Sequence, residues 1–199
     1  MRQLIECVPN FSEGRDVARI DALVAAMSGV PHAWVLDRHS DADHNRTVIT
    51  LAGDPEAVAE AALRGVGEAT RLIDINQHSG AHPRIGATDV LPFVPMEGVT
   101  LQDCAVLAHR VGRALWERYR VPVYYYAEAA LRPERFALEK IRNGQLEALR
   151  RDAQTDPARR PDVGGPALHP SAGAVAIGAR TFLIAYNINL DTQDVEIAV

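Results

Sequence analysis

The sequence has little cysteine, few aromatic residues and almost no lysine. Its two cysteines, Cys7 and Cys104, lie inside apolar runs in a chain without a secretory pattern, so we expect buried reduced thiols and no disulfide framework. Only Lys140 is a lysine, a bias that we attribute to genome composition. No apolar stretch approaches the roughly 18 to 20 residues of a membrane span, and the N-terminus does not resemble a signal peptide. These absences predict a cytoplasmic protein.

A net basic charge is also missing. The chain of 199 residues carries a formal charge of −5 at pH 7, which argues against a dedicated nucleic-acid binder, because phosphate contacts demand a basic surface. An apolar fraction of 47% gives a chain of this length a sizeable core, enough for one domain or two small ones. Small molecules or other proteins are therefore the expected partners.

The hydrophobic periodicity predicts an α+β fold. Four strands and two helices are expected in the order β-α-β-β-α-β: strands over 3–8, 32–37, 46–52 and 89–94, and helices between Asp16 and Gly29 and over 55–72. This is the ferredoxin-like unit, with a mostly antiparallel or mixed sheet and helices on one face. Further elements extend it: a helix over 100–118, a strand over 121–126, one or two short surface helices within 132–160, and apolar runs over 173–177 and 182–190.

The loop that follows the second helix carries the clearest chemistry. It contains His78, His82 and Arg84 within a stretch broken by glycine and proline. Histidine has an unperturbed pKa that suits proton transfer near neutrality, and an arginine can fork onto a carboxylate. The alternative is a pair of exposed histidines beside a structural turn.

Two other polar clusters have equally open interpretations. His39, Asp41, Asp43 and His44 at the expected hairpin tip could form a metal site or a proton relay, or simply a hydrated turn. Residues 10–14 follow a strand and precede a helix, so they could bind an anion or serve only as a capping loop.

Several motifs occur in an order that resembles the glutamate formimidoyltransferase family. They are LIECVPNFSEGR, DHNRTV, HSGAHPRIGATDVLPFVP, VPVYYYAEAA, RPDVGGPALHPSAGA and GARTFLIAYNINL, and they cover essentially the whole chain. The resemblance implies transfer of a formimino group from N-formimino-L-glutamate to N5 of tetrahydrofolate, with release of glutamate, in histidine degradation. It also implies two ferredoxin-like subdomains with the folate in the cleft between them.

The resemblance assigns site residues as well. The general base falls on His82, in the HPR motif. The folate-contacting loop falls on Val163, Gly164, Gly165, Pro166, Ala167, Leu168, His169, Pro170, Ser171 and Ala172. We expect Arg46 and Arg84 to bind the carboxylates of the donor, because guanidinium and carboxylate pair bidentately. Asn10, Asn187 and Asn189 are candidates to orient the amidine or the pterin.

The family chemistry needs no metal and no tightly bound cofactor, since tetrahydrofolate is a co-substrate. The expected partners are formiminoglutamate and folate, including polyglutamylated folate, and a second copy in a homodimer, with no nucleic acid or membrane.

The chain ends at Val199, nine residues after Leu190, where the second subdomain of the family would begin. We therefore expect residues 1–199 to form the N-terminal subdomain alone. The alternatives are a non-catalytic short folate-binding relative, a formyl-transferring relative, and a metal-binding protein built on the hairpin cluster.

Overall fold

The computed structural model describes residues 2–184, 190–192 and 197. Its strands are β1 (Leu4–Cys7), β2 (Asn10–Phe11), β3 (Ala33–Asp41), β4 (Arg46–Gly53), β5 (Thr88–Glu97), β6 (Val123–Ala127) and β7 (Val175–Ala179). Its α-helices are α1 (Val17–Ser28), α2 (Pro55–Leu72), α3 (Leu101–Tyr119), α4 (Leu138–Arg142) and α5 (Gln145–Thr155). Single 3-10 turns occur at Ile75–Gln77, Pro133–Arg135 and Pro157–Arg159. This content confirms the α+β class.

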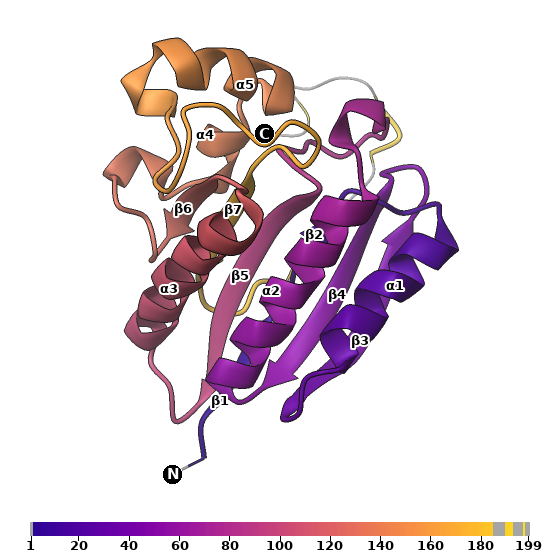
Figure 1. Ribbon diagram of the computed structural model, residues 1–199, viewed down its shortest axis with the longest axis vertical. Helices are drawn as coiled ribbons and strands as arrows, with labels where there is room; N and C mark the ends of the chain where they lie inside the picture. The colour runs from indigo at the N-terminus through magenta and orange to yellow at the C-terminus, as the bar shows by residue number, and fades with distance from the viewer. Residues whose placement is uncertain (1, 185–189, 193–196, 198–199) are drawn as a thin grey trace.

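All described strands join one mixed sheet in the order β1-β4-β2-β5-β7-β6, with β3 paired to β4 at one edge (Figure 1). The pairs among β1 to β5 are antiparallel, as expected for the ferredoxin-like unit. Strand β7 is parallel to both of its neighbours, β5 and β6. The last strand in the chain is thus inserted between two earlier ones.

The three long helices cover one face of the sheet (Figure 1). They pack on a core that includes Ile5, Phe11, Leu51, Phe93 and Tyr125. Both cysteines are free and buried in this core, as expected. Burial raises the pKa of Cys104 to about 11 and also raises the pKa of Cys7 well above its usual value, so both thiols stay protonated near neutral pH. Among the described residues, no helix is both long and apolar enough to span a membrane.

The two short helices make a second core on β6 and β7. Tyr124 and Tyr126 pack there with Ile141, Leu146 and Leu149, while Tyr125, between them on the strand, faces the first core. The alternation of a strand therefore buries all three tyrosines, and none of them forms an exposed aromatic surface. The basic segment over 132–160 was predicted to form surface helices because of its charge. In the structure these helices also have a buried apolar side.

Element ends follow local chemistry. The Asp16 side chain accepts hydrogen bonds from the backbone N–H groups of Ala18 and Arg19 and so caps α1, and proline after Asp54 opens α2. The two-residue strand β2 was expected to be loop, and β3 extends further into the hairpin tip than predicted. The apolar run over 182–190 falls partly outside the described residues.

Candidate active site

Two loops that are far apart in sequence lie side by side at one end of the sheet. The loop over 78–87 and the loop over 163–174 are joined by backbone hydrogen bonds, from Ala87 N to Ala172 O (2.9 Å) and from Ala174 N to Ile85 O (3.0 Å). The loop with the candidate base is thereby fixed against the loop that the resemblance assigns to folate.

His82 is half-buried on the first of these loops. Burial lowers its pKa to about 4, and the positive charges of Arg46 and Arg142 and the neighbouring His44 act in the same direction. The His44 and His82 rings lie edge to face, with centroids 6.3 Å apart. His82 is therefore neutral at physiological pH and has a lone pair with which to accept a proton.

A buried ion pair supports this loop from below. Asp89, which is 1% exposed, accepts a hydrogen bond from Arg142 on α4 and another, 2.8 Å long, from the backbone N–H of Ile85. Burial raises the pKa of Asp89 while Arg142 opposes that rise. The pair joins α4 to the loop that carries His82, and the charge of Arg142 acts on His82.

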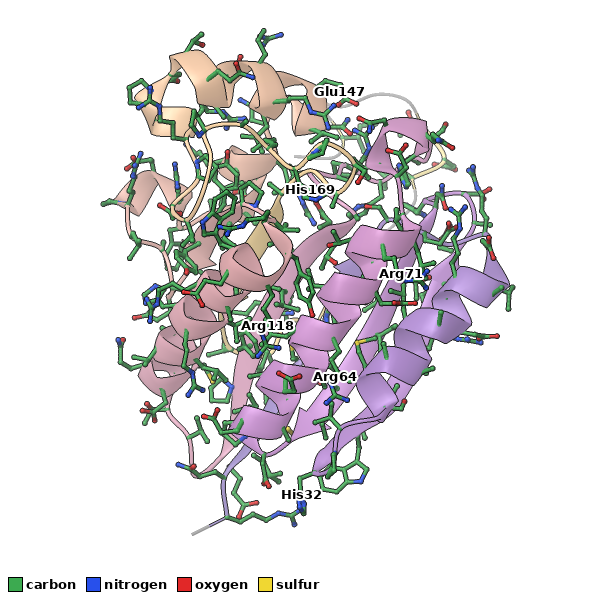
Figure 2. All side chains as sticks on the ribbon, in the orientation of Figure 1. His32, Arg64, Arg71, Arg118, Glu147 and His169 are labelled. Carbon is green, nitrogen blue, oxygen red and sulfur yellow. The ribbon has the colours of Figure 1, made fainter. Side chains whose placement is uncertain are left out.

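The guanidinium of Arg84 is already paired with an acidic side chain. Its guanidinium binds both carboxylate oxygens of Glu147 on α5, at 2.8 and 3.0 Å, and also the side-chain oxygen of Gln145 at 3.2 Å. Figure 2 shows Glu147 near the end of the sheet that holds His169, whereas His32 lies at the opposite end. A substrate carboxylate at Arg84 would have to displace Glu147.

Asn45 links the hairpin tip to the His82 loop. Its side-chain oxygen accepts from Gly14 N (2.9 Å), its amide nitrogen donates to Ser79 O (3.1 Å), and its backbone oxygen bonds His78 Nε2 (2.9 Å). Its backbone is left-handed, with φ +49°, which asparagine tolerates better than most residues. His78 is thus a structural residue of this junction.

The hairpin cluster does not bring its acidic and histidine side chains together as a metal site. His44 Nδ1 lies 2.9 Å from the Asp41 carboxylate, which also accepts the His44 N–H, and these bonds lower the pKa of Asp41. Within the part of the chain that the structure describes, no group of three or more histidine, cysteine or acidic side chains is placed to hold a metal ion.

The second loop has a shape that depends on glycine. Gly164 and Gly165 have φ +76° and +81°, and a Cβ on Gly164 would lie 2.4 Å from the Trp116 ring. The His169 ring nitrogen Nδ1 accepts the N–H groups of Ser171 (3.3 Å) and Ala172 (3.0 Å). His169 therefore orders the loop from within.

The remaining expected residues divide between the described and undescribed parts. Asn10 lies on β2, beside Val48 of β4, and donates to Val8 O at 3.0 Å. Asn187 and Asn189 lie outside the described residues. Sequence reasoning missed Arg142 and Asp89. The acid in the HPRIGATD run was visible, but nothing in the sequence joined it to an arginine 53 positions later.

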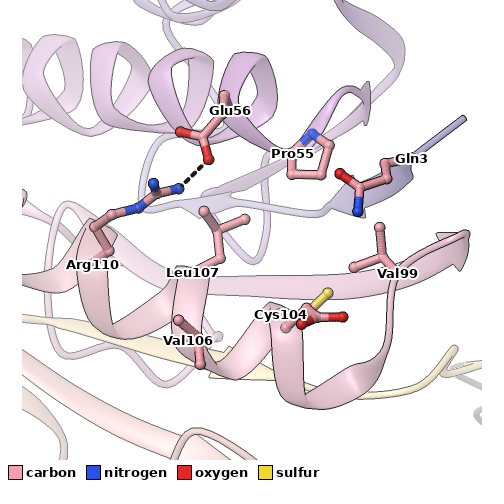
Figure 3. Close-up of a pocket in the computed structure, with 9 residues that line it drawn as sticks. Gln3, Pro55, Glu56, Val99, Cys104, Val106, Leu107 and Arg110 are labelled. Carbon is pink, nitrogen blue, oxygen red and sulfur yellow. Dashed lines mark hydrogen bonds and ion pairs between the residues drawn. The ribbon is translucent and has the colours of Figure 1, made fainter. Parts of the chain in front are cut away.

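A separate cavity of about 270 Å³ lies between the starts of α2 and α3 (Figure 3). Cys104 and Leu107 line it, and the ion pair of Glu56 and Arg110, 2.6 Å long, crosses it. His82 and the loop over 163–172 do not contribute to its lining.

Comparison with known proteins identifies the family. Residues 4–180 match the model of the formiminotransferase domain, N-terminal subdomain. Glutamate formimidoyltransferase of Streptococcus pyogenes is 45% identical over 199 residues, and that of Thermoplasma acidophilum is 46% identical over 196. The matches cover 100% and 98% of this chain but only 66% and 64% of those proteins. Formimidoyltransferase-cyclodeaminase of Gallus gallus is 50% identical over 190 residues, which are 96% of this chain and 35% of that protein. The chain belongs to the formiminotransferase family, through the match of residues 4–180 to its N-terminal subdomain.

Proposed function

We propose that the chain is the base-carrying part of a glutamate formimidoyltransferase. In this reaction N5 of tetrahydrofolate attacks the amidine carbon of N-formimino-L-glutamate, and the bond from that carbon to the glutamate nitrogen then breaks. His82 takes the proton that N5 loses and returns it to the departing nitrogen, so glutamate leaves as the neutral amine. The one-carbon group ends on folate, in a step of histidine degradation.

The observation that carries the proposal is the state and place of His82. Its low pKa keeps the imidazole neutral, and its loop is bonded directly to the loop over 163–172, which we propose binds the folate. A base held beside a bound nucleophile supplies proximity as well as proton transfer. The names of the curated relatives support formimino transfer over the formyl-transferring and non-catalytic alternatives.

We also propose which residues contact the small-molecule substrates. Arg46 is a carboxylate anchor for the donor, and Asn10 together with Asn187 and Asn189 hydrogen-bonds the amidine or the pterin. Arg84 is a second anchor only if the Glu147 carboxylate is exchanged for that of the substrate. No metal and no tightly bound cofactor enters the proposed reaction.

The test is formimino transfer by the purified chain, followed by the absorbance of methenyl-folate after acid conversion. We expect turnover by the wild type and a loss of about 10²- to 10⁴-fold for His82→Ala, with unchanged folding because the residue is only half-buried. Replacing the donor by formylglutamate separates the two possible one-carbon groups.

A near wild-type rate for His82→Ala would refute the base assignment. If neither protein turns over while the wild type still binds tetrahydrofolate, the chain is a folate-binding module or one half of an active site.

We also propose a cytoplasmic homodimer that uses polyglutamylated folate. The segment over 132–160 holds eight arginine or lysine residues against five acidic ones, which favours an anionic tail. Sedimentation of a monomer at high concentration would contradict the dimer, and equal affinity for mono- and polyglutamate at low salt would contradict the tail contact.

A further inference from the structure

Arg46 carries a charge that the described residues leave unpaired. It is half-buried at the start of β4, and no hydrogen bond or ion pair joins its guanidinium to any described residue. Its Nε is buried without a partner. Burying an unpaired cation is costly, so such a group in a native fold calls for an explanation.

Arg142 presents a second guanidinium at the same place. Its Nη2 donates to Asp89, but its Nε is also buried without a hydrogen-bond partner. Hydrogen bonds bring both arginines to the His82 loop: Asp89, which binds Arg142, also accepts the Ile85 N–H (2.8 Å), and Asn45, next to Arg46, donates to Ser79 O (3.1 Å). Burial lowers the pKa of both Arg46 and His82, and the charge of Arg142 lowers both further. Arg46 comes from a strand and Arg142 from a helix, so separate elements bring the two guanidiniums to this loop.

Asp89 is the one buried carboxylate that binds either guanidinium within the described part of the chain, and it binds Arg142. Asp41 and Asp89 attract Arg46 electrostatically, but neither carboxylate is hydrogen-bonded to its guanidinium. Among the described residues Arg46 therefore has no ion-pair partner, and its guanidinium can bind an anion.

We propose that Arg142 and Arg46 form a carboxylate clamp beside His82 and that it holds a carboxylate of the glutamate moiety of the donor. This inference rests on the proposed function, and it names a residue, Arg142, that the sequence did not suggest. Arg84 is not part of the clamp, because Glu147 already occupies its fork. Asp89 is a positioning residue that holds Arg142 in place.

The clamp has a consequence for the base. Burial lowers the pKa of His82 most, and the charges of Arg46 on β4, Arg142 on α4 and His44 at the hairpin tip lower it further, whereas the backbone of Pro83 opposes the shift. A bound carboxylate neutralises part of this positive field, so binding raises the pKa of His82. The donor thereby increases the proton affinity of the base that acts on it, towards the operating pH at which general bases are most effective.

The test is an NMR titration of the His82 imidazole in the full chain, with and without L-glutamate. In the wild type we expect the midpoint to move upward from about 4 when glutamate is bound. The variant Arg142→Gln leaves Asp89 buried and unpaired, so the double variant Arg142→Gln/Asp89→Asn is the better probe, because it removes both charges. It should bind glutamate at least about tenfold more weakly and show no upward movement of the midpoint.

The matched control is Arg151→Gln, an exposed arginine whose one ion-pair partner among the described residues is the adjacent Asp152. It should titrate and bind like the wild type. The clamp is overturned if the double variant binds glutamate as tightly as this control, if glutamate leaves the His82 titration unmoved, or if the wild type binds neither glutamate nor its formimino derivative.

These readouts do not depend on turnover. Glutamate binding that requires Arg142 in a chain without transferase activity would preserve the clamp and show that this chain alone does not carry out the transfer. Turnover whose KM for the donor is unchanged in the double variant would preserve the function and remove the clamp.

Discussion

At the scale of the residue, the charge state of His82 is set by its surroundings. An isolated imidazole would be partly protonated near neutrality, but burial and two guanidiniums keep this one neutral. One of these guanidiniums, that of Arg46, has no ion-pair partner among the described residues, and its Nε is buried without a hydrogen bond. An anionic substrate would supply the negative charge that pairs with Arg46.

Protonation of His82 should therefore make folding stability depend on pH. Its pKa is about 4 in the folded chain and 6.5 in the unfolded one, so between these values the unfolded chain binds more protons. As pH falls from 6.5 to 4, the free energy of unfolding of the wild type should decrease relative to that of His82→Gln. Urea unfolding at several pH values checks this, and parallel curves for the two proteins would contradict the lowered pKa.

The pairing of Arg84 with Glu147 makes a second prediction. Because Glu147 is exposed, the ion pair should contribute only about 0–1 kcal/mol, and Glu147→Gln should unfold almost like the wild type. The KM for the donor should also stay within about twofold, because the clamp lies elsewhere. A markedly lower KM in this variant would show that Glu147 competes with substrate for Arg84.

At the scale of the element, the hairpin tip determines where the His82 loop lies. Asn45 joins that tip to two other segments through its side chain, and its left-handed backbone is part of the junction. Short polar tips of this kind are usually assigned to solvent alone. Here the tip is a structural support for the loop that carries His82.

Two substitutions distinguish the contribution of the Asn45 side chain to stability from that of its left-handed backbone. Asn45→Gly removes the side-chain hydrogen bonds but keeps the left-handed conformation, whereas Asn45→Ala loses both. The alanine variant should be less stable than the glycine variant by about 1–2 kcal/mol, as measured by denaturant unfolding. Equal stabilities would mean that the left-handed backbone carries no cost at this position.

The glycine loop makes a further prediction at this scale. Gly164→Ala should lower the free energy of unfolding by at least about 1 kcal/mol and weaken tetrahydrofolate binding. The alanine would have to adopt a left-handed backbone conformation, and its Cβ would clash with the Trp116 ring. Adding Trp116→Ala to this variant should restore part of the folate affinity by removing the contact. Folate affinity that is unchanged in Gly164→Ala would separate this loop from the folate site.

The sequence predicted the features of the fold that depend on local interactions, and it did not predict those that depend on long-range contacts. Asp16 and the Asp54-Pro55 pair predicted helix starts correctly, because caps act within a few residues. The β-α-β-β-α-β order followed from periodicity, which is likewise local. The place of β7 between β5 and β6, and the pairing of Asp89 with Arg142, were not predictable, because no local pattern encodes contacts over such separations. The base and folate loops were assigned by resemblance, and their adjacency comes from the structure.

At the scale of the whole molecule, two cores share the strands β5, β7 and β6. The second core, around Tyr124 and Leu149, lies under the helices that carry Arg142 and Glu147. A buried ion pair between Asp162 and Arg135, 2.6 Å long, adjoins this second core. The position of the clamp therefore depends on packing far from His82 in sequence.

Leu149→Ala should reveal this dependence. The side chain is fully buried, so its truncation should cost about 2–5 kcal/mol of unfolding free energy. Because both cores include residues of the same strands, hydrogen exchange should report loss of protection in α5 and in β7 together. Continued full protection of β7 would show that the second core opens independently of the sheet.

The central place of β7 has a consequence for synthesis of the chain. Strands β5 and β6 emerge from the ribosome before β7, yet neither can complete its pairing until residues 175–179 are available. The contacts between the base loop and the folate loop, such as that from Ala174 to Ile85, also wait for this segment. A nascent chain shorter than this has its helices and hairpin but no assembled site, so the ability to bind folate should arise abruptly once residues 175–179 have been synthesised.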